Sequence, residues 1–229
     1  MQSEKPRREI KSFVRREGRL TPGQQKALDN LWPLWGIDDA ETPIDLNALF
    51  GRDNPKVLEI GFGNGASLAE MAANQPDMDF IGVEVHRPGV GQLLKSIDDR
   101  KLTNVRVACT DAVAMLKNRI ADSALHRVQL YFPDPWHKKR HHKRRIIQPA
   151  FVDVLAAKIA VGGNLHMATD WQDYAEQMLQ DLSASEDFTN LGTFDGYIER
   201  PDYRPLTKFE QRGHRLGHGV WDLLFERHK

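Results

Sequence analysis

The chain carries a carboxylate directly before a run of alternating glycines. Glu59 is followed by Gly61, Gly63 and Gly65. Glycines let the backbone approach a ligand closely, and the free N–H groups at the start of a following helix add hydrogen-bond donors. Residues 57–60 are otherwise apolar, which is typical of a buried parallel strand that leads into such a turn. The pattern therefore predicts a nucleotide-like cofactor at the carboxyl end of a sheet.

Two cofactors fit these glycines. Gly61, Gly63 and Ala66 match the looser dinucleotide pattern G-x-G-x-x-G/A, so the glycines alone leave a nicotinamide cofactor open. Glu59 favours S-adenosylmethionine instead. A carboxylate at the mouth of the site repels a pyrophosphate strongly at low dielectric. S-adenosylmethionine has no phosphate and carries an ammonium and a sulfonium, so an acidic mouth suits it.

Two further expected strands end in acids. Residues 79–85 include Glu84, at about the spacing from which a carboxylate reaches a pair of ribose hydroxyls. Residues 104–111 end in Asp111. Each acid alone is explained equally well as a helix cap or a first-turn residue. Three acids at three successive strand ends favour an anionic pocket for a cationic cofactor.

The next expected strand, residues 127–132, runs into the segment Pro133-Asp134-Pro135-Trp136-His137. Two prolines make this segment stiff and place Asp134 beside the other acids. Residues 138–145 follow, with six Lys or Arg, two His and no acid. Alone, the first segment reads as an ordinary turn and the second as a solvated loop. Together, at a strand end, they favour a phosphate backbone bound next to the active site.

Length and composition limit the class of protein that the chain can be. The chain has 229 residues, 40% of them hydrophobic, and a formal net charge of zero, which fits one α/β domain with an extension. No stretch approaches the roughly 20 apolar residues of a membrane span, and no signal peptide is visible after Met1. The single cysteine, Cys109, leaves no internal disulfide. We expect a cytoplasmic protein without a metal site.

Strands and helices alternate from Lys56 onward, which predicts an open, mostly parallel sheet covered on both faces. The expected strands are 56–60, 79–85, 104–109, 127–132, 163–168 and 220–225, and the expected helices lie near 66–75, 89–99, 111–120, 149–159 and 171–182. Residues 1–50 are expected to form a basic arm and helical extension, turn-rich around Trp32 and Pro33, and residues 51–229 the cofactor-binding domain. For the arm, an RNA contact and a solvated segment are equally compatible with its charges.

In these motifs the chain resembles the bacterial tRNA (guanine-N7-)-methyltransferases, which act on the guanosine at position 46 of the variable loop. The resemblance spans about residues 55 to 225. It rests on the segments 59–65, 84–89, 132–141, 166–171 and 204–213. The Pro-Asp-Pro-Trp segment and the last two segments are far more specific than the glycine turn, which all such methyltransferases share.

The resemblance implies a Rossmann-like class I methyltransferase fold. In that fold a seven-stranded, mostly parallel sheet carries helices on both faces, and its last strand is antiparallel. The resemblance also implies S-adenosyl-L-methionine as the cofactor and tRNA as the partner. It implies no obligatory protein partner, so a monomer or a homodimer is expected.

Roles for individual residues follow from the same resemblance. The cofactor-binding residues are expected to be Glu59, Gly61, Gly63, Gly65, Glu84, Asp111 and Asp134, with Asp134 also at the catalytic centre. Contacts to the target nucleotide are expected from Lys138, Asp170, Thr207, Lys208, Phe209 and Glu210. The expected RNA-contacting segment comprises Arg140, His141, His142, Lys143, Arg144 and Arg145.

The chemistry of the target atom is simple. Guanine N7 has an in-plane lone pair and no hydrogen, so it attacks a sulfonium methyl group without a general base. What helps is in-line positioning and stabilisation of the cationic purine, for which a carboxylate such as Asp134 is suited. Glu210 or Asp170 would accept from guanine N1–H and the 2-amino group. Three alternatives stay open: a methyltransferase of another RNA or a small molecule, a nicotinamide-dependent oxidoreductase, and a non-catalytic RNA-binding protein.

Overall fold

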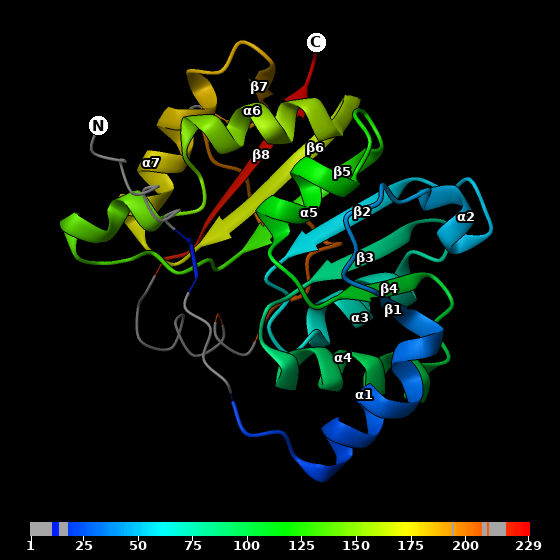
Figure 1. The fold of residues 1–229 in the computed structure, drawn as a ribbon. Helices are drawn as coiled ribbons and strands as arrows, with labels where there is room; N and C mark the ends of the chain where they lie inside the picture. The colour runs from blue at the N-terminus through cyan, green and yellow to red at the C-terminus, as the bar shows by residue number, and fades with distance from the viewer. Residues whose placement is uncertain (1–10, 14–17, 194, 208–209, 211–218) are drawn as a thin grey trace, which may run out of the picture.

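The computed structural model describes residues 11–13, 18–193, 195–207, 210 and 219–229. Its centre is a sheet of eight strands in the order β1-β4-β3-β2-β5-β6-β8-β7 (Figure 1). The strands are β1 (Gly36–Ile37), β2 (Lys56–Ile60), β3 (Asp79–Val83), β4 (Val105–Ala108), β5 (Leu125–Tyr131), β6 (Ile159–Thr169), β7 (Phe188–Asn190) and β8 (Trp221–Arg227).

The sheet is parallel from β1 through β6 along this order, and β8 pairs antiparallel with both β6 and β7. The expected antiparallel last strand is therefore confirmed. The strand count differs from seven because Gly36 and Ile37, in the expected extension, pair with Val107 and Ala108 at the edge of the sheet. Two residues are too few to show the hydrophobic pattern of a strand, so the sequence did not predict this strand.

Helices cover both faces of the sheet. They are α1 (Pro22–Trp35), α2 (Leu46–Phe50), α3 (Ala66–Asn74), α4 (Arg87–Arg100), α5 (Ala112–Arg119), α6 (Pro149–Lys158) and α7 (Gln172–Ser183), with a 3₁₀ helix at Lys139–Arg144. One buried cluster joins α1, α3 and α4 to Val57 of β2, and the other joins α2, α5, α6 and α7 to Leu58 and Ile60. Successive residues of β2 thus face opposite layers, as a strand requires.

The segment around Trp32 and Pro33 is helical rather than turn-rich. Thr21 begins α1 with a capping box: the Gln24 N–H donates to Thr21 Oγ1 at 3.3 Å, and the Thr21 N–H donates to Gln24 Oε1 at 2.9 Å. Pro22 stands at the first position of the helix, where a missing N–H costs nothing. Pro33 falls in the last turn, so it removes one hydrogen bond at the fraying end.

The helix α1 packs against α4 and buries Ala27 there, and β1 extends the main sheet. The boundary between residues 50 and 51 stays a prediction, because the extension shares the core of the domain that it precedes. Among the described residues, no helix is long and apolar enough to cross a membrane.

Candidate active site

The glycine turn follows β2 as expected. Gly61, Gly63 and Gly65 all adopt left-handed backbone conformations, with φ of +72°, +62° and +75°. A Cβ atom at Gly61 or Gly63 would meet nothing within 4 Å, whereas one at Gly65 would lie 2.6 Å from Cβ of Leu93. The first two glycines therefore leave open space beside the turn, and Gly65 allows α3 to approach α4 closely.

Glu84 ties this turn to the end of β3. Its Oε2 atom accepts from the Gly63 N–H at 3.0 Å, and its Oε1 atom accepts from the N–H groups of Val85 and His86 at 2.7 and 3.0 Å. Three backbone donors thus fix the carboxylate in one orientation. The remaining lone pairs of the carboxylate are available to hydroxyl donors of a ligand.

A cavity of about 490 Å³ opens at the carboxyl ends of the parallel strands. Glu84, Asp111 and Asp134 all line it, so the structure brings together three of the four expected acids. Asp111 also caps α5 by accepting from the Val113 N–H at 3.0 Å. The capping role and the place in the pocket are therefore compatible for this residue. The volume lies in the range of small-molecule sites.

Glu59 lies beside this cavity rather than among its lining residues. It is buried between β3 and β5, opposite Gly82 and Gln129, and only 4% of its surface is exposed. Within the part of the chain that the structure describes, its Oε2 atom has no hydrogen-bond partner. Burial, and then the charge of Glu84, raise the pKa of Glu59 to about 8. A cationic group beside this buried oxygen, such as the ammonium of S-adenosylmethionine, would favour the ionised form of Glu59, so the position next to the glycine turn fits such a group.

The raised pKa of Glu59 has a consequence for stability. The folded protein holds a proton on Glu59 that the unfolded chain releases between about pH 4.5 and 8. The free energy of unfolding should therefore fall by roughly 1 kcal/mol per pH unit across this window, and level off above it. Glu59→Gln should remove this slope and exceed the wild type in stability at pH 8. Urea unfolding of both cofactor-free proteins at pH 5, 6.5 and 8 gives the free energy of unfolding at each pH. The same dependence on pH in the two proteins would contradict the expectation.

The loop that carries Asp134 is held in an unusual conformation. Phe132 and Trp136 both have left-handed backbones, with φ of +51° and +48°, on either side of the two prolines. The Asp134 Oδ1 atom accepts from the Trp136 N–H at 2.9 Å. The loop therefore presents the exposed carboxylate of Asp134 at the rim of the cavity with its backbone restrained.

The segment Lys11–Phe13 lies across this loop. The indole N–H of Trp136 donates to the carbonyl of Ser12 at 3.2 Å, and the Arg144 guanidinium donates to the carbonyls of Lys11 and Phe13 at 3.2 Å. The guanidinium also stacks over the Trp136 ring at 4.0 Å. Ser12 and Phe13 line the cavity as a result. Neither residue is predicted from the sequence, since nothing in the basic arm indicates where it docks.

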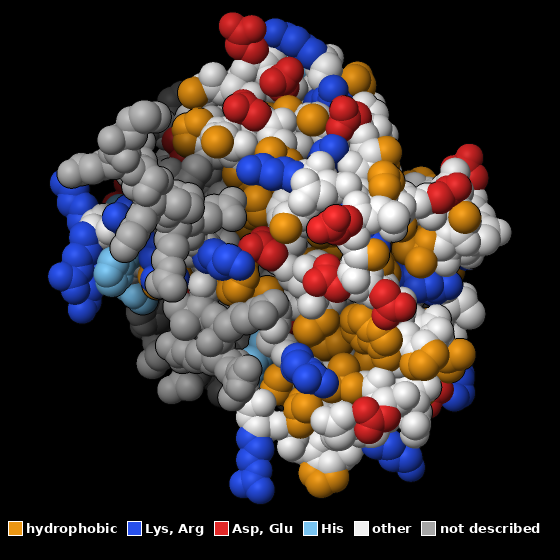
Figure 2. Space-filling model, in the orientation of Figure 1, with side chains coloured by type: hydrophobic (Ala, Val, Ile, Leu, Met, Phe, Trp, Pro, Cys, Tyr) orange, Lys and Arg blue, Asp and Glu red, His pale blue; other side chains and the backbone are white. Residues whose placement is uncertain are grey.

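The basic segment divides into exposed and buried members. Lys138, Lys139, Arg140 and Lys143 are exposed, and His141, His142 and Arg144 are half-buried. Figure 2 shows lysine and arginine side chains with histidines at the left margin of the molecule, where Figure 1 draws this segment. The exposed members form a surface that is open to an anionic partner.

Arg145 does not belong to that surface. Only 2% of the residue is exposed, and its guanidinium donates to the Pro135 carbonyl at 2.9 Å and to Gln177 Oε1 at 2.7 Å. It also forms an ion pair with Asp173. The expected RNA contact from Arg145 is therefore corrected: this side chain joins the Asp134 loop to α7, and its donors are used inside the protein.

The expected contacts to the target nucleotide fall into three groups. Lys138 and Asp170 are exposed at the same end of the sheet as Asp134, and Asp170 directly follows β6. Thr207 is half-buried, and Glu210 is buried against Arg204. Lys208 and Phe209 lie outside the described residues.

Comparison with known proteins identifies the family. A family model described as "Putative methyltransferase" matches residues 53–223. A tRNA (guanine-N(7)-)-methyltransferase of Aeromonas hydrophila is 62% identical over 96% of this chain and 93% of its own. One of Yersinia enterocolitica is 60% identical over 96% of this chain and 92% of its own.

Solved structures support the fold. The antibiotic-resistance methyltransferase Kmr matches with a TM-score of 0.57 at 13% identity, over 84% of this chain and 95% of its own. The 16S rRNA methyltransferase KamB matches with a TM-score of 0.55 at 14% identity, over 82% of this chain and 95% of its own. These likenesses confirm the Rossmann-like methyltransferase fold. The identities over nearly the whole length show that the chain belongs to the tRNA (guanine-N(7)-)-methyltransferase family.

Proposed function

We propose that the chain transfers a methyl group from S-adenosyl-L-methionine to N7 of a guanosine in tRNA, at position 46 of the variable loop. One observation carries the proposal: a cavity rimmed by three carboxylates runs directly into an exposed basic surface. Among the described residues, Glu84, Asp111 and Asp134 form no ion pair with a protein cation. The acidic cavity suits a cationic cofactor, and the exposed basic surface next to it suits a polyanionic substrate.

In this proposal, different residues around the cavity bind different parts of the cofactor. Glu84, already fixed by backbone donors, accepts from the ribose hydroxyls. Glu59 and the turn from Gly61 to Gly65 hold the methionine portion, and Asp111 adds a carboxylate after β4. Bound there, S-adenosylmethionine supplies an electrophilic methyl group on its sulfonium.

Asp134 is the proposed catalytic residue. N7 of guanine needs no deprotonation to react, so the site has to hold the base in line and stabilise the positive charge that develops on it. The Pro-Asp-Pro segment and the hydrogen bond from the Trp136 N–H pre-orient the carboxylate for that task. Phe13 and Ser12 cover part of the cavity and reduce the access of water to it.

Asp170, Lys138 and Thr207 are the proposed contacts to the guanine. Asp170 and Lys138 are exposed at the correct end of the sheet. Asp170 is favoured over Glu210 as the acceptor for N1–H and the 2-amino group, because both Glu210 oxygens already accept hydrogen bonds within the protein. The proposed setting is the cytoplasm, with the protein acting as a monomer or a homodimer. Residues 1–50 form the extension and residues 51–229 the methyltransferase domain.

Methyl transfer to defined tRNAs tests the proposal. The protein is incubated with methyl-labelled S-adenosylmethionine and an unmodified tRNA transcript, and with the same transcript carrying adenosine at position 46. We expect labelled 7-methylguanosine from the first transcript and none from the second. Label in both would place the target elsewhere, and binding of tRNA without transfer would indicate a non-catalytic RNA-binding protein. A rise in melting temperature with a nicotinamide cofactor alone would favour an oxidoreductase.

Replacing Glu84 tests the cofactor assignment. Glu84→Ala removes the proposed acceptor for the ribose, together with one hydrogen bond to Gly63 of the glycine turn and two to Val85 and His86. A hydrogen bond to a charged group contributes roughly 1.5–3 kcal/mol, so affinity for S-adenosylmethionine should fall about 10- to 100-fold. Calorimetric titration gives the dissociation constant, with Glu70→Ala on the exposed face of α3 as the matched control. An unchanged constant would remove Glu84 from the cofactor site.

Neutralising the exposed basic surface tests the RNA contact. The triple variant Lys139→Gln, Arg140→Gln and Lys143→Gln should bind tRNA more weakly and keep its affinity for the cofactor. The slope of log affinity against log salt concentration should become shallower by roughly 0.7–0.9 for each phosphate that the variant no longer neutralises. Replacing the exposed Lys26, Lys95 and Lys117 by Gln is the matched control, with the same change in charge. Equal slopes in the two triple variants would show that residues 138–145 form only a solvated surface.

A further inference from the structure

A buried polar network lies behind the wall of the cavity. Its centre is His166 on β6, which has no exposed surface. The hydroxyls of Tyr131 and Tyr203 lie 2.9 and 3.0 Å from His166 Nδ1, and Asp222 Oδ1 lies 2.9 Å from His166 Nε2. Burial lowers the pKa of His166 and raises the pKa of Tyr131, so the ring is neutral and the hydroxyl keeps its proton. Nε2–H therefore donates to Asp222, and the single lone pair of Nδ1 is shared by the hydroxyls of Tyr131 and Tyr203.

Asp222 connects this histidine to Arg204. The Arg204 Nε donates to Asp222 Oδ1 at 2.7 Å, and one terminal nitrogen donates to Asp222 Oδ2 at 2.8 Å. This two-point contact fixes the guanidinium plane as well as its position. Arg204 and Asp222 are 1% and 3% exposed, so the pair lies inside the protein and not at its surface.

The same guanidinium holds Glu210. A terminal nitrogen of Arg204 donates to Glu210 Oε1 at 2.7 Å, and the Thr207 N–H donates to Glu210 Oε2 at 2.8 Å. The Glu210 N–H in turn donates to Thr207 Oγ1 at 3.1 Å, which closes the reciprocal pattern of a capping box. Only 2% of Glu210 is exposed. Both oxygens of the Glu210 carboxylate therefore accept hydrogen bonds within the protein, from Thr207 and Arg204.

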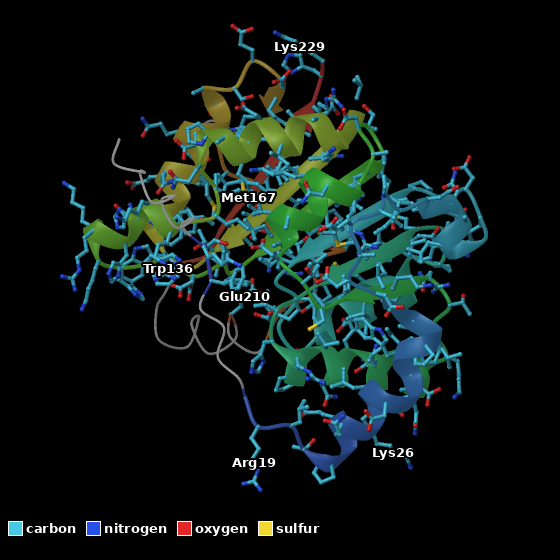
Figure 3. The ribbon with its side chains drawn as sticks, viewed as in Figure 1. Arg19, Lys26, Trp136, Met167, Glu210 and Lys229 are labelled. Carbon is cyan, nitrogen blue, oxygen red and sulfur yellow. The ribbon has the colours of Figure 1, made fainter. Side chains whose placement is uncertain are left out.

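The other end of the network reaches the loop of Asp134. Tyr131 lines the cavity, and the chain passes from it through Phe132 and Pro133 to Asp134. The Arg204 guanidinium lies 5.7 Å from the ring centres of both Tyr131 and Phe132. Figure 3 shows Glu210 and Trp136 at the same end of the sheet. The buried Arg204 thus contacts both Glu210 and the two residues that lead into the Asp134 loop, Tyr131 and Phe132.

We propose that Arg204 and Glu210 are positioning residues, which fix Thr207 relative to the Asp134 loop, and that Glu210 does not itself contact the guanine. This inference rests on the proposed function. Alignment of N7 with the methyl group depends in this proposal on the distance between Thr207 and Asp134, so a small shift of either residue lowers the rate. The base is then read by exposed groups such as Asp170.

Inosine separates positioning from direct contact. A tRNA with inosine at position 46 lacks the 2-amino group but keeps N7, N1–H and O6. Glu210→Gln should lower kcat at least tenfold, and by the same factor for guanosine and inosine, while the KM for tRNA and the affinity for S-adenosylhomocysteine change less than twofold. Asp170→Asn is the contrasting variant, and its effect should be smaller for inosine because one of its partners is already missing. A smaller effect of Glu210→Gln on inosine would overturn the proposal, as would unchanged activity.

A double-mutant cycle gives a second, independent readout. Arg204→Lys keeps the buried charge but cannot make the three contacts to Asp222 and Glu210 together. Because both side chains act through one arrangement, the double variant Arg204→Lys, Glu210→Gln should be no slower than the slower single variant. Multiplied losses would mean independent roles and would overturn the proposal. Wild-type activity on guanosine tRNA, measured alongside, reports on the proposed function separately, and the inosine comparison on Glu210→Gln stands alone if Arg204→Lys does not fold.

Discussion

A tRNA with 7-deazaguanosine at position 46 should bind this protein with nearly normal affinity and accept no methyl group. The substitution replaces N7 by C–H and leaves the 2-amino group, N1–H and O6 in place. The proposed contacts from Asp170 and Lys138 remain, and the exposed basic surface still meets the same phosphates. Only the lone pair that attacks the methyl group is lost, and no other atom of the base is aligned to replace it.

The measurement is transfer from labelled S-adenosylmethionine to the two tRNAs, with binding measured in parallel. The normal tRNA with the Glu84→Ala protein serves as the control for an intact acceptor with a weakened cofactor site. Equal incorporation into both tRNAs would show that N7 is not the acceptor, and the mechanism would have to be abandoned. Loss of binding together with transfer would mean that N7 is also a recognition group.

Asp134→Asn should lower kcat by roughly 100-fold, comparable to removing one charge-stabilising group from other active sites. The amide oxygen still accepts from the Trp136 N–H, so the loop keeps its hydrogen bond and loses only the negative charge. That charge is proposed to stabilise the purine as it becomes cationic. Because no proton has to leave N7, the residual rate of the variant should not rise with pH in the way that replacement of a missing general base by hydroxide would produce.

Single-turnover kinetics with saturating cofactor and tRNA isolate this step from binding and product release. Asp153→Asn, on the exposed surface of α6, makes the same change in charge away from the cavity and should leave the rate unaltered. A rate for Asp134→Asn within twofold of the wild type would remove Asp134 from the chemistry. A loss confined to cofactor affinity would make it a binding residue instead.

The sequence by itself determined the central strands and the acids at their ends. Strand 56–60 agrees with the structure residue for residue, and strands 79–85 and 104–109 differ only at their ends. Buried parallel strands are nearly continuous apolar runs, so the local composition predicts where each strand begins and ends. Since parallel strands end at one edge of a sheet, the meeting of Glu84, Asp111 and Asp134 followed from those limits alone. The helix α1 was also encoded locally, in Thr21, Pro22 and Gln24, but the aromatic residues and Pro33 obscured that signal.

Only the tertiary structure decided which of the predicted polar and charged side chains are free to bind a ligand. Arg140 and Arg145 stand in one basic run, yet one is exposed and the other is buried against Asp173 and Gln177. Glu210 is enclosed because Arg204 donates to it, and the distant Asp222 fixes Arg204 in that position. Ser12 lines the cavity because the Trp136 indole N–H donates to its carbonyl. Burial and pairing of a charged side chain depend on contacts between distant segments. A local pattern records the type of a side chain, but not the partner that the fold brings to it.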